Sequence, residues 1–267
     1  MSEKRTPAEP VLAATILLVR DGRDGLEMFM VQRHHQIDFA TGAMVFPGGK
    51  LEPGDRDPGL RERAPSAASL SDAELALRAG AIRETFEEAH VLLARRRGTG
   101  ALLTGEQELA IEARHRAALE SHEIVLGEVL AAEDLELACD RLVPFAHWIT
   151  PEFMPKRFDT HFFLVEAPVD QVAVHDGHES VDSIWITPPA AVAEAEAGRR
   201  SIIFPTLQNV KKLGRAKSVA EALEAARREP IVTVLPRVVR TERGALFRIP
   251  PEAGYEFTEG PLEALRS

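Results

Sequence analysis

The chain has 267 residues, of which 45% are hydrophobic, and 42 acidic against 32 basic side chains give it a net charge of −10. This hydrophobic fraction is ordinary for a globular protein, and no apolar run reaches the roughly 18 residues that a membrane-spanning helix needs. An acidic chain without a basic stripe is a poor partner for duplex nucleic acid, whose binding comes mostly from phosphate neutralisation.

The cysteine content and the amino terminus suggest where the chain resides. Cys139 is the only cysteine, which excludes an intrachain disulfide and suits a reducing compartment. Met1–Pro10 is polar and charged and lacks the apolar segment of a secretory signal. We therefore expect a cytoplasmic protein without a membrane partner.

The first predicted elements form a hairpin. Val11–Arg20 is a β-branched apolar run, the turn residues Asp21–Gly25 follow it, and Leu26–Gln32 alternates as a returning strand. Met44–Phe46 then leads into Pro47-Gly48-Gly49, where regular structure is hard to continue. Residues 53–70 are rich in Pro, Gly and charged residues and predict a solvated loop.

A long helix is predicted next. Ser71 with Glu74 three residues later is a capping box, and the helix is expected to run to about Ala94. Arg95–Arg97 would then lie where the helix dipole favours cations. Residues 106–120 and 128–140 have helical composition and predict an inserted helical region.

The remaining chain alternates strands and helices. We expect three strands, then helices opened by Pro188 and by Ser218 and one at Leu207–Leu213. A small β-rich tail should follow at residues 230–260. The predicted strands are Arg141–Thr150, Thr160–Glu166, Ser183–Thr187, Ile231–Leu235 and Ala245–Ile249. Without repeats or a low-complexity linker, this pattern favours one elaborated α/β domain.

The segment with most chemical content lies on the predicted long helix. At about 100° per residue, Ile82, Phe86, Ala89 and Leu93 form one apolar stripe that should face the core. Glu84, Glu87 and Glu88 fall on the opposite side, about 140–240° from Ile82. One interpretation is a solvated acidic face; the other is a site for a hard divalent cation, which prefers carboxylate oxygens.

The loop upstream favours the second interpretation. Gly48 and Gly49 allow the backbone to pass close to a metal ion or a phosphate. A glycine pair alone is usually a turn, but its conjunction with a three-carboxylate helix is specific.

With these residues the chain resembles the Nudix superfamily, whose box reads Gly-x5-Glu-x7-Arg-Glu-U-x-Glu-Glu-x-Gly-U, with U apolar. Gly49 matches the first glycine, Asp55 stands in the position of the isolated glutamate, and the second half is matched by Arg83, Glu84, Glu87, Glu88 and Val91. Residues 56–82 number 27 rather than seven, so about 20 residues are inserted. His90 replaces the last glycine; it is either a capping or surface histidine or a donor to the diphosphate.

The split box, preceded by Thr41–Gly49, is similar to the branch that includes the peroxisomal coenzyme A diphosphatase-like proteins. Pro155–Phe163 and Phe204-Pro205-Thr206 also match. The resemblance implies an α/β (α+β) fold, an α/β/α sandwich with a mixed sheet. The Nudix domain would span residues 8–214, with the box at 49–91, an insertion at about 56–75 and a helical insertion at about 98–140. Residues 215–267 would form a C-terminal helix and a small β-rich extension packed on the core.

The resemblance also implies a mechanism. Mg²⁺ or Mn²⁺ would be held by Glu84, Glu87, Glu88 and the Gly49 carbonyl, and Glu87 or Glu84 would act as general base. Arg83 would orient the carboxylates. Further candidates for substrate contact each also fit a surface position; these are Arg33, Gly48, Lys156, Arg157 and Glu179.

The expected reaction is hydrolysis of a diphosphate bond in a nucleoside diphosphate derivative. Coenzyme A or an acyl-coenzyme A is the first choice of substrate; ADP-ribose, a dinucleotide or a nucleotide sugar is the alternative. A non-catalytic nucleotide sensor is a third interpretation, which the retained carboxylates disfavour. Dimers are frequent among relatives, so a homodimer is allowed.

Overall fold

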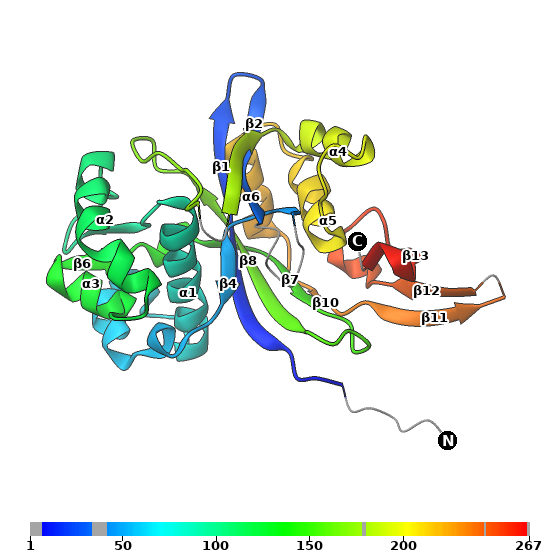
Figure 1. Cartoon of the computed structure of the whole chain (residues 1–267), viewed down its shortest axis with the longest axis horizontal. Helices are drawn as coiled ribbons and strands as arrows, with labels where there is room; N and C mark the ends of the chain where they lie inside the picture. Colours follow the sequence, from blue (N-terminus) through cyan, green and yellow to red (C-terminus); the bar gives the residue numbers. More distant parts are fainter. Residues whose placement is uncertain (1–6, 34–41, 178–179, 243, 266–267) are drawn as a thin grey trace.

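The computed structural model describes residues 7–33, 42–177, 180–242 and 244–265. A mixed eight-stranded sheet with strand order β10-β7-β8-β1-β2-β3 lies at its centre, with β4 paired to β1 and β9 paired to β2 (Figure 1). Helices cover both faces, so the α/β/α arrangement predicted from the sequence is confirmed. Among the described residues, no helix is both long and apolar enough to cross a membrane.

Strand β1 (Val11–Gly22) lies at the middle of this sheet. It turns at Gly25, whose φ is 116°, into β2 (Gly25–Arg33), as the sequence predicts. One edge of β1 pairs in parallel with β8 (Phe158–Glu166) along residues 11–19. The other edge is shared, because β2 pairs with residues 19–22 and β4 (Gly48–Lys50) pairs with residues 13–15. The two glycines are therefore built into the sheet rather than left in a loop.

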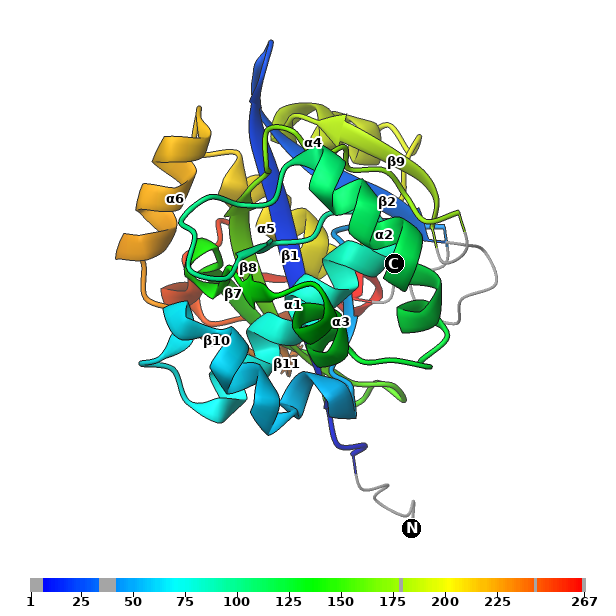
Figure 2. The same cartoon turned by 90° about the vertical axis from the view of Figure 1, so that its left-hand side faces the viewer.

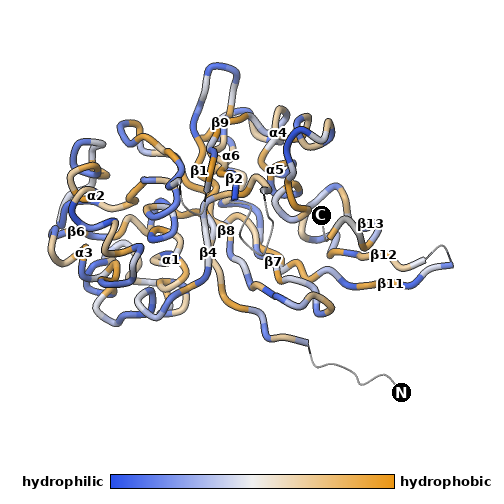
Figure 3. Tube along the Cα trace, in the orientation of Figure 1, coloured by the Kyte–Doolittle hydropathy of each residue, from blue (hydrophilic) through white to orange (hydrophobic). Residues whose placement is uncertain are grey.

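The other strands extend the sheet on both sides. β7 (Val143–Ile149) is antiparallel to β8, and β10 (Thr233–Val234) is parallel to β7. On the far side, β3 (Met44–Val45) and β9 (Ser180–Ile186) are both antiparallel to β2. Figure 3 shows hydrophobic stretches in the strands around β1 and β7 and a hydrophilic turn in the β1–β2 hairpin.

Alternate side chains of β1 enter two separate cores. Ile16 and Leu18 pack with α1 (Asp72–Ala89) and with the inserted helices α2 (Gly105–Glu120) and α3 (Leu126–Ala132), which lie in front of the sheet in Figure 2. Leu17 and Val19 face the other core. That core includes residues of α4 (Pro188–Glu196), α5 (Phe204–Leu213) and α6 (Val219–Arg228). Burial on both faces explains why β1 is apolar almost throughout.

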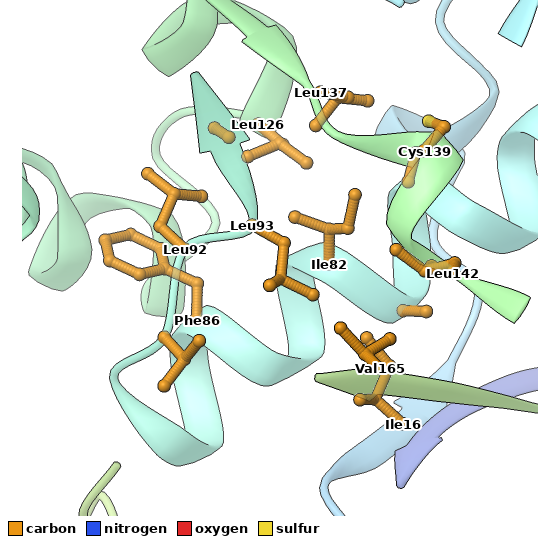
Figure 4. Close-up of a cluster of buried hydrophobic side chains, with 14 of the residues drawn as sticks. Ile16, Ile82, Phe86, Leu92, Leu93, Leu126, Leu137, Cys139, Leu142 and Val165 are labelled. Carbon is orange, nitrogen blue, oxygen red and sulfur yellow. The ribbon is translucent and has the colours of Figure 1, made fainter. Parts of the chain in front are cut away.

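Helix α1 ends earlier than expected. It stops at Ala89, and His90 adopts the left-handed conformation with φ of 56°, which turns the chain back. Leu92 and Leu93 then enter the same apolar cluster as Ile82 and Phe86 from an extended segment (Figure 4). The apolar stripe was therefore correctly assigned to the core, but its last member is not helical.

Two neighbouring predictions were wrong for related reasons. Ala94–Arg96 forms β5, paired with β6 (Leu135–Leu137), so these arginines do not follow a helix terminus and residues 133–140 do not continue α3. Residues 53–70 are not a solvated loop. They form three short 3-10 helices that bury Leu60 and Ala67 completely, namely η1 (Pro53–Arg56), η2 (Pro58–Arg63) and η3 (Pro65–Ala67).

The C-terminal extension packs on the core beside α5. It contains a three-stranded sheet of β11 (Arg237–Thr241), β12 (Gly244–Arg248) and β13 (Glu259–Pro261), with short 3-10 turns η5 (Pro251–Ala253) and η6 (Leu262–Leu265). Tyr255 joins it to the core. Its hydroxyl accepts a hydrogen bond from Trp148 Nε1 at 2.9 Å and donates one to Asn209 Oδ1 at 2.7 Å.

The Tyr255→Phe variant should lower the free energy of unfolding by about 1–3 kcal/mol, because the Trp148 indole N–H and the Asn209 carbonyl would both lose a buried partner. The midpoint of urea unfolding measures this loss. Val169→Ala, at a side chain that is 97% exposed, should change stability by less than about 0.5 kcal/mol. Equal midpoints for the Tyr255→Phe variant and the unaltered protein would contradict the anchoring role of Tyr255.

Candidate active site

The carboxylate-bearing helix is fixed at its start and held close to the preceding loop. Ser71 caps α1 by accepting a hydrogen bond from the Glu74 backbone N–H. The Glu74 carboxylate in turn accepts one from the Ser71 backbone N–H, as the sequence predicts. Gly80 lies where the loop meets the helix. A Cβ at this position would lie 2.9 Å from Asp55 Oδ2, so only glycine allows the Asp55 carboxylate to approach α1 this closely.

Arg83 is the centre of the site. Its side chain is only 4% exposed, and its guanidinium binds three carboxylates and one backbone carbonyl. Nε and Nη2 donate to the two oxygens of Asp55 at 3.0 and 3.1 Å, and Nη1 donates to Glu87 at 2.7 Å. Nη2 also donates to Glu84 at 3.0 Å and to the Lys50 carbonyl at 2.9 Å. One cation therefore holds three of the box carboxylates, those of Asp55, Glu84 and Glu87.

Asp55 completes the box despite the insertion. It is 1% exposed, and its Oδ2 also accepts a hydrogen bond from the Glu52 backbone N–H at 2.8 Å. Its two bonds to Arg83 form the planar fork that guanidinium and carboxylate groups prefer. The residues inserted between Asp55 and Arg83 therefore leave these two groups in contact.

The two glycines bring the backbone of β4 against the carboxylates of α1. A Cβ at Gly49 would lie 2.5 Å from Glu84 Oε1, and a Cβ at Gly48 would lie 2.5 Å from the Ala14 carbonyl. The Gly48 backbone N–H donates to Glu88 Oε2 at 2.8 Å. The sequence connected the two glycines with the glutamates only by inference; in the structure their backbone lies directly against Glu84 and Glu88.

Burial disfavours the ionised form of two of these carboxylates and so raises their pKa values. Desolvation raises the pKa of Glu84 to about 8, against the attraction of Arg83 and with a further rise from Glu87. Desolvation likewise raises the pKa of Glu87 to about 7, again opposed by Arg83. The side chains of Glu84 and Glu87 are only 13% and 14% exposed. The cost of burying their charge therefore exceeds the attraction that the Arg83 guanidinium provides.

The donor types of the box suit a hard divalent cation. Among the described residues, however, Glu84, Glu87 and Glu88 do not bring one ligand atom each within 4.8 Å of one another. Glu87 Oε1 is buried and has no hydrogen-bond partner, so one oxygen of the cluster is available to a ligand. Because Gly49 has no side chain, its backbone lies directly beside the Glu84 carboxylate. A Cβ at this position would occupy that space. Carboxylate and carbonyl oxygens are the ligands that Mg²⁺ accepts in proteins.

The inserted helix α2 supports the C-terminal end of the box helix. Arg116 Nη2 donates to the Glu87 carbonyl at 2.8 Å, and Glu112 Oε1 lies 2.8 Å from His90 Nδ1. Burial and the Arg116 charge lower the pKa of His90. The His90 side chain thus contacts α2 while its backbone caps α1, which agrees with the capping interpretation of this residue.

The predicted substrate-contacting residues have different surroundings. Among the described residues, none is a hydrogen-bond partner for the buried Nε of Arg33, which suits a residue that meets an anion. Arg157 is 8% exposed and donates to the carbonyls of Thr150 and Ala8, so its guanidinium binds the chain itself. Lys156 is exposed. Glu179 lies outside the described residues.

Two contributors to the site were missed by sequence reasoning. The Lys50 carbonyl binds Arg83 through the backbone, for which a sequence has no signal. Arg116 lies in the inserted helix, and only the packing of α2 against α1 brings it to Glu87. No spacing rule connects an insertion to the element that it covers.

The chain is similar to known proteins over most of its length. A profile described as the NUDT19 Nudix domain matches residues 56–213 and so begins one residue after Asp55. The Caenorhabditis elegans protein called putative nudix hydrolase 7 is 26% identical over 190 residues, which are 71% of this chain and 56% of that protein. The chain thus spans little more than half of that relative.

Two further similarities agree with the profile. The human protein called acyl-coenzyme A diphosphatase NUDT19 is 25% identical over 300 aligned positions, covering 91% of this chain and 76% of that protein. The crystal structure of a NUDIX hydrolase from Alicyclobacillus acidocaldarius superposes with a TM-score of 0.64 at 25% identity, covering 81% of this chain and 96% of that one. The chain therefore belongs to the NUDT19 Nudix domain family.

Proposed function

We propose that this chain hydrolyses the diphosphate bond of a nucleoside diphosphate derivative, with coenzyme A or an acyl-coenzyme A as the preferred substrate and Mg²⁺ or Mn²⁺ as cofactor. The observation that carries the proposal is the contact of the Gly48–Gly49 backbone with Glu84 and Glu88, on the same helix turns where Arg83 binds Glu84 and Glu87. The name of the human relative supports the choice of coenzyme A substrates.

The proposed ligands are Glu84, Glu87, Glu88 and the Gly49 carbonyl. When bound, a divalent ion neutralises phosphate oxygens and lowers the pKa of a water molecule. Arg83 acts as a positioning residue, because it binds one oxygen each of Glu84 and Glu87. The second oxygen of each carboxylate is then available to a metal ion or a water molecule.

A proton acceptor for the attacking water is also present in the cluster. Glu87 is the first choice of general base and Glu84 the second, since Glu87 Oε1 has no protein partner. A base is most efficient when its pKa lies near the working pH; in the metal-free cluster burial raises the pKa of Glu87, and a bound cation would lower it again.

The substrate phosphates need donors from the chain. Arg33 is the first choice, because its buried Nε lacks a partner. The Gly48 backbone N–H, which now bonds to Glu88, is a second donor. Lys156 and Arg157 are weaker choices, and Glu179, which lies outside the described residues, stays a candidate from the sequence alone for a further metal ligand or base.

Incubation with a panel of diphosphates and either metal ion tests the substrate. Coenzyme A should yield 4′-phosphopantetheine and 3′,5′-ADP, with a higher kcat/KM than ADP-ribose, a dinucleotide or a nucleotide sugar. Cleavage of ADP-ribose without cleavage of coenzyme A would reject this substrate. Tight nucleotide binding with no turnover of any member would favour a sensor instead.

Substitution of the carboxylates tests their roles. Glu87→Gln should lower kcat about 10²–10⁴-fold, the range for loss of a general base. Glu88→Gln should raise the Mg²⁺ concentration required for half-maximal activity. Glu106→Gln, at an exposed glutamate of α2, is the control and should leave both quantities unchanged. Near-full activity of Glu88→Gln at low Mg²⁺ would show that the metal assignment is wrong.

Asp55→Asn tests the positioning of Arg83. Because it leaves a buried guanidinium without its bidentate partner, we expect unfolding in the absence of metal to be easier by about 3–5 kcal/mol. Asp57→Asn is the matched control: Asp57 is exposed and caps η2 through the Gly59 N–H, a role that asparagine also fills. Equal urea midpoints for the two variants would contradict the role of Asp55.

A further inference from the structure

A second group of metal-ligand side chains lies on the central sheet outside the box. His147 of β7 and His161 of β8 are direct cross-strand partners, and Asp159 precedes His161 by two residues on the same strand. Since alternate residues of a strand share a face, all three side chains lie on one side of the sheet. Phe163, two residues beyond His161, enters the core that α1 covers, which identifies that side.

The three side chains converge on one point. His147 Nε2 lies 2.5 Å from Asp159 Oδ1, and His161 Nε2 lies 3.7 Å from the same oxygen. The two imidazole rings stack with centroids 4.0 Å apart. In the part of the chain that the structure describes, this is the one group of three or more His, Cys, Asp or Glu residues whose ligand atoms all lie within 4.8 Å of one another.

The neighbouring strand orients the first ligand. Thr233 of β10 is the register partner of His147, and its hydroxyl lies 2.8 Å from His147 Nδ1. Histidines that bind metals usually have their second ring nitrogen fixed in this way, which selects the tautomer and aims the other nitrogen. With Nδ1 bound to Thr233, Nε2 of His147 faces the Asp159 carboxylate.

The charges around the group have opposing effects. Burial and the charge of Arg78 disfavour a positive charge on the His161 ring, whereas the Asp159 carboxylate favours one. Arg78 also opposes a cation, although its guanidinium lies over the Phe163 ring, with Cζ 5.1 Å from the ring centroid. The Asp159 carboxylate offsets that charge.

We propose that His147, Asp159 and His161 bind a divalent transition-metal ion, with Zn²⁺ the best match, at a site separate from the carboxylate box. Two imidazoles and one carboxylate suit Zn²⁺ or its first-row neighbours, whereas Mg²⁺ selects oxygen ligands. The ion would tie β7 to β8 next to β10. The ligand side chains are 16–30% exposed, which leaves access for a water molecule as a further ligand.

The present distances are close to those of an occupied site. Metal–ligand bonds of about 2.0–2.1 Å in a tetrahedral arrangement separate ligand atoms by about 3.3 Å. His147 and Asp159 must therefore part by less than about 1 Å, and His161 must approach by about half that amount. The two rings, now stacked with an interplanar angle of 20°, must also rotate so that both Nε2 lone pairs point at one ion. The alternative is that Thr233, His147 and Asp159 form only a hydrogen-bonded chain. That alternative does not explain why His161 Nε2 also points at Asp159 Oδ1.

The test is a competition titration of the full chain, without an affinity tag, with Zn²⁺ against a chromophoric chelator in excess Mg²⁺. One Zn²⁺ should bind per chain under these conditions, because Mg²⁺ fills the oxygen site and leaves the imidazole site. His147→Gln, Asp159→Asn and His161→Gln should each weaken Zn²⁺ binding tenfold or more. His122→Gln, at a histidine whose side chain is 67% exposed, and Glu88→Gln should leave this affinity unchanged.

A second measurement uses the unaltered protein and does not depend on how the variants fold. Co²⁺ added in excess Mg²⁺ should give the intense visible absorption of a four-coordinate nitrogen–oxygen site, and Zn²⁺ should abolish it. No bound Zn²⁺, undiminished binding in the three variants, loss of binding in Glu88→Gln, or a weak six-coordinate Co²⁺ spectrum would each overturn the proposal. Because the readout is binding in excess Mg²⁺, it does not depend on the hydrolase activity.

Discussion

The buried guanidinium of Arg83 is the constraint on which the box depends. A buried charge is tolerated only when partners surround it, and here Asp55, Glu84 and Glu87 all contact one cation. The acids outnumber the base and water is mostly excluded, so the cluster cannot keep all of its carboxylates ionised without a further cation, and the pKa values of Glu84 and Glu87 are raised. That imbalance is what a divalent ion would relieve. The same interaction explains why Gly80 must lack a side chain, why η1 follows β4 closely and why the Lys50 carbonyl faces inward.

The two proposed metal-ligand groups are connected by one row of register partners in the sheet, and they differ in chemistry. Thr233, His147, His161, Ala14 and Gly49 are successive register partners across β10, β7, β8, β1 and β4. Ala14 is small and fully buried, and it lies between the two imidazoles and Gly49, the glycine in contact with Glu84. At one end the donors are nitrogen and oxygen, and at the other they are oxygen alone. Such a difference allows neighbouring sites on one scaffold to select different metal ions.

Local rules predicted the elements that local chemistry controls. The Ser71 cap, the β1–β2 hairpin and the Ser218 cap follow from short-range bonds, and the structure contains each of them. The end of α1 was misplaced because His90 accepts a positive φ that glycine usually supplies, supported by contacts with α2. The buried 3-10 segments could not be predicted from polar composition, since Leu60 and Ala67 owe their burial to tertiary packing. The histidine group depends on the register of β7 against β8, which no periodicity encodes.

The parallel pairing of β1 with β8 has a consequence for how the chain reaches its native state. Residues 23–157 must be synthesised before β8 can lie beside β1 along its whole length. Until then the hairpin of β1 and β2 carries an apolar edge with no partner, the kind of surface that promotes association between chains. Contacts this distant in sequence also slow folding, because a long loop must close before they form. We therefore expect the central sheet to assemble late during synthesis, and fragments that end before residue 158 to aggregate rather than fold.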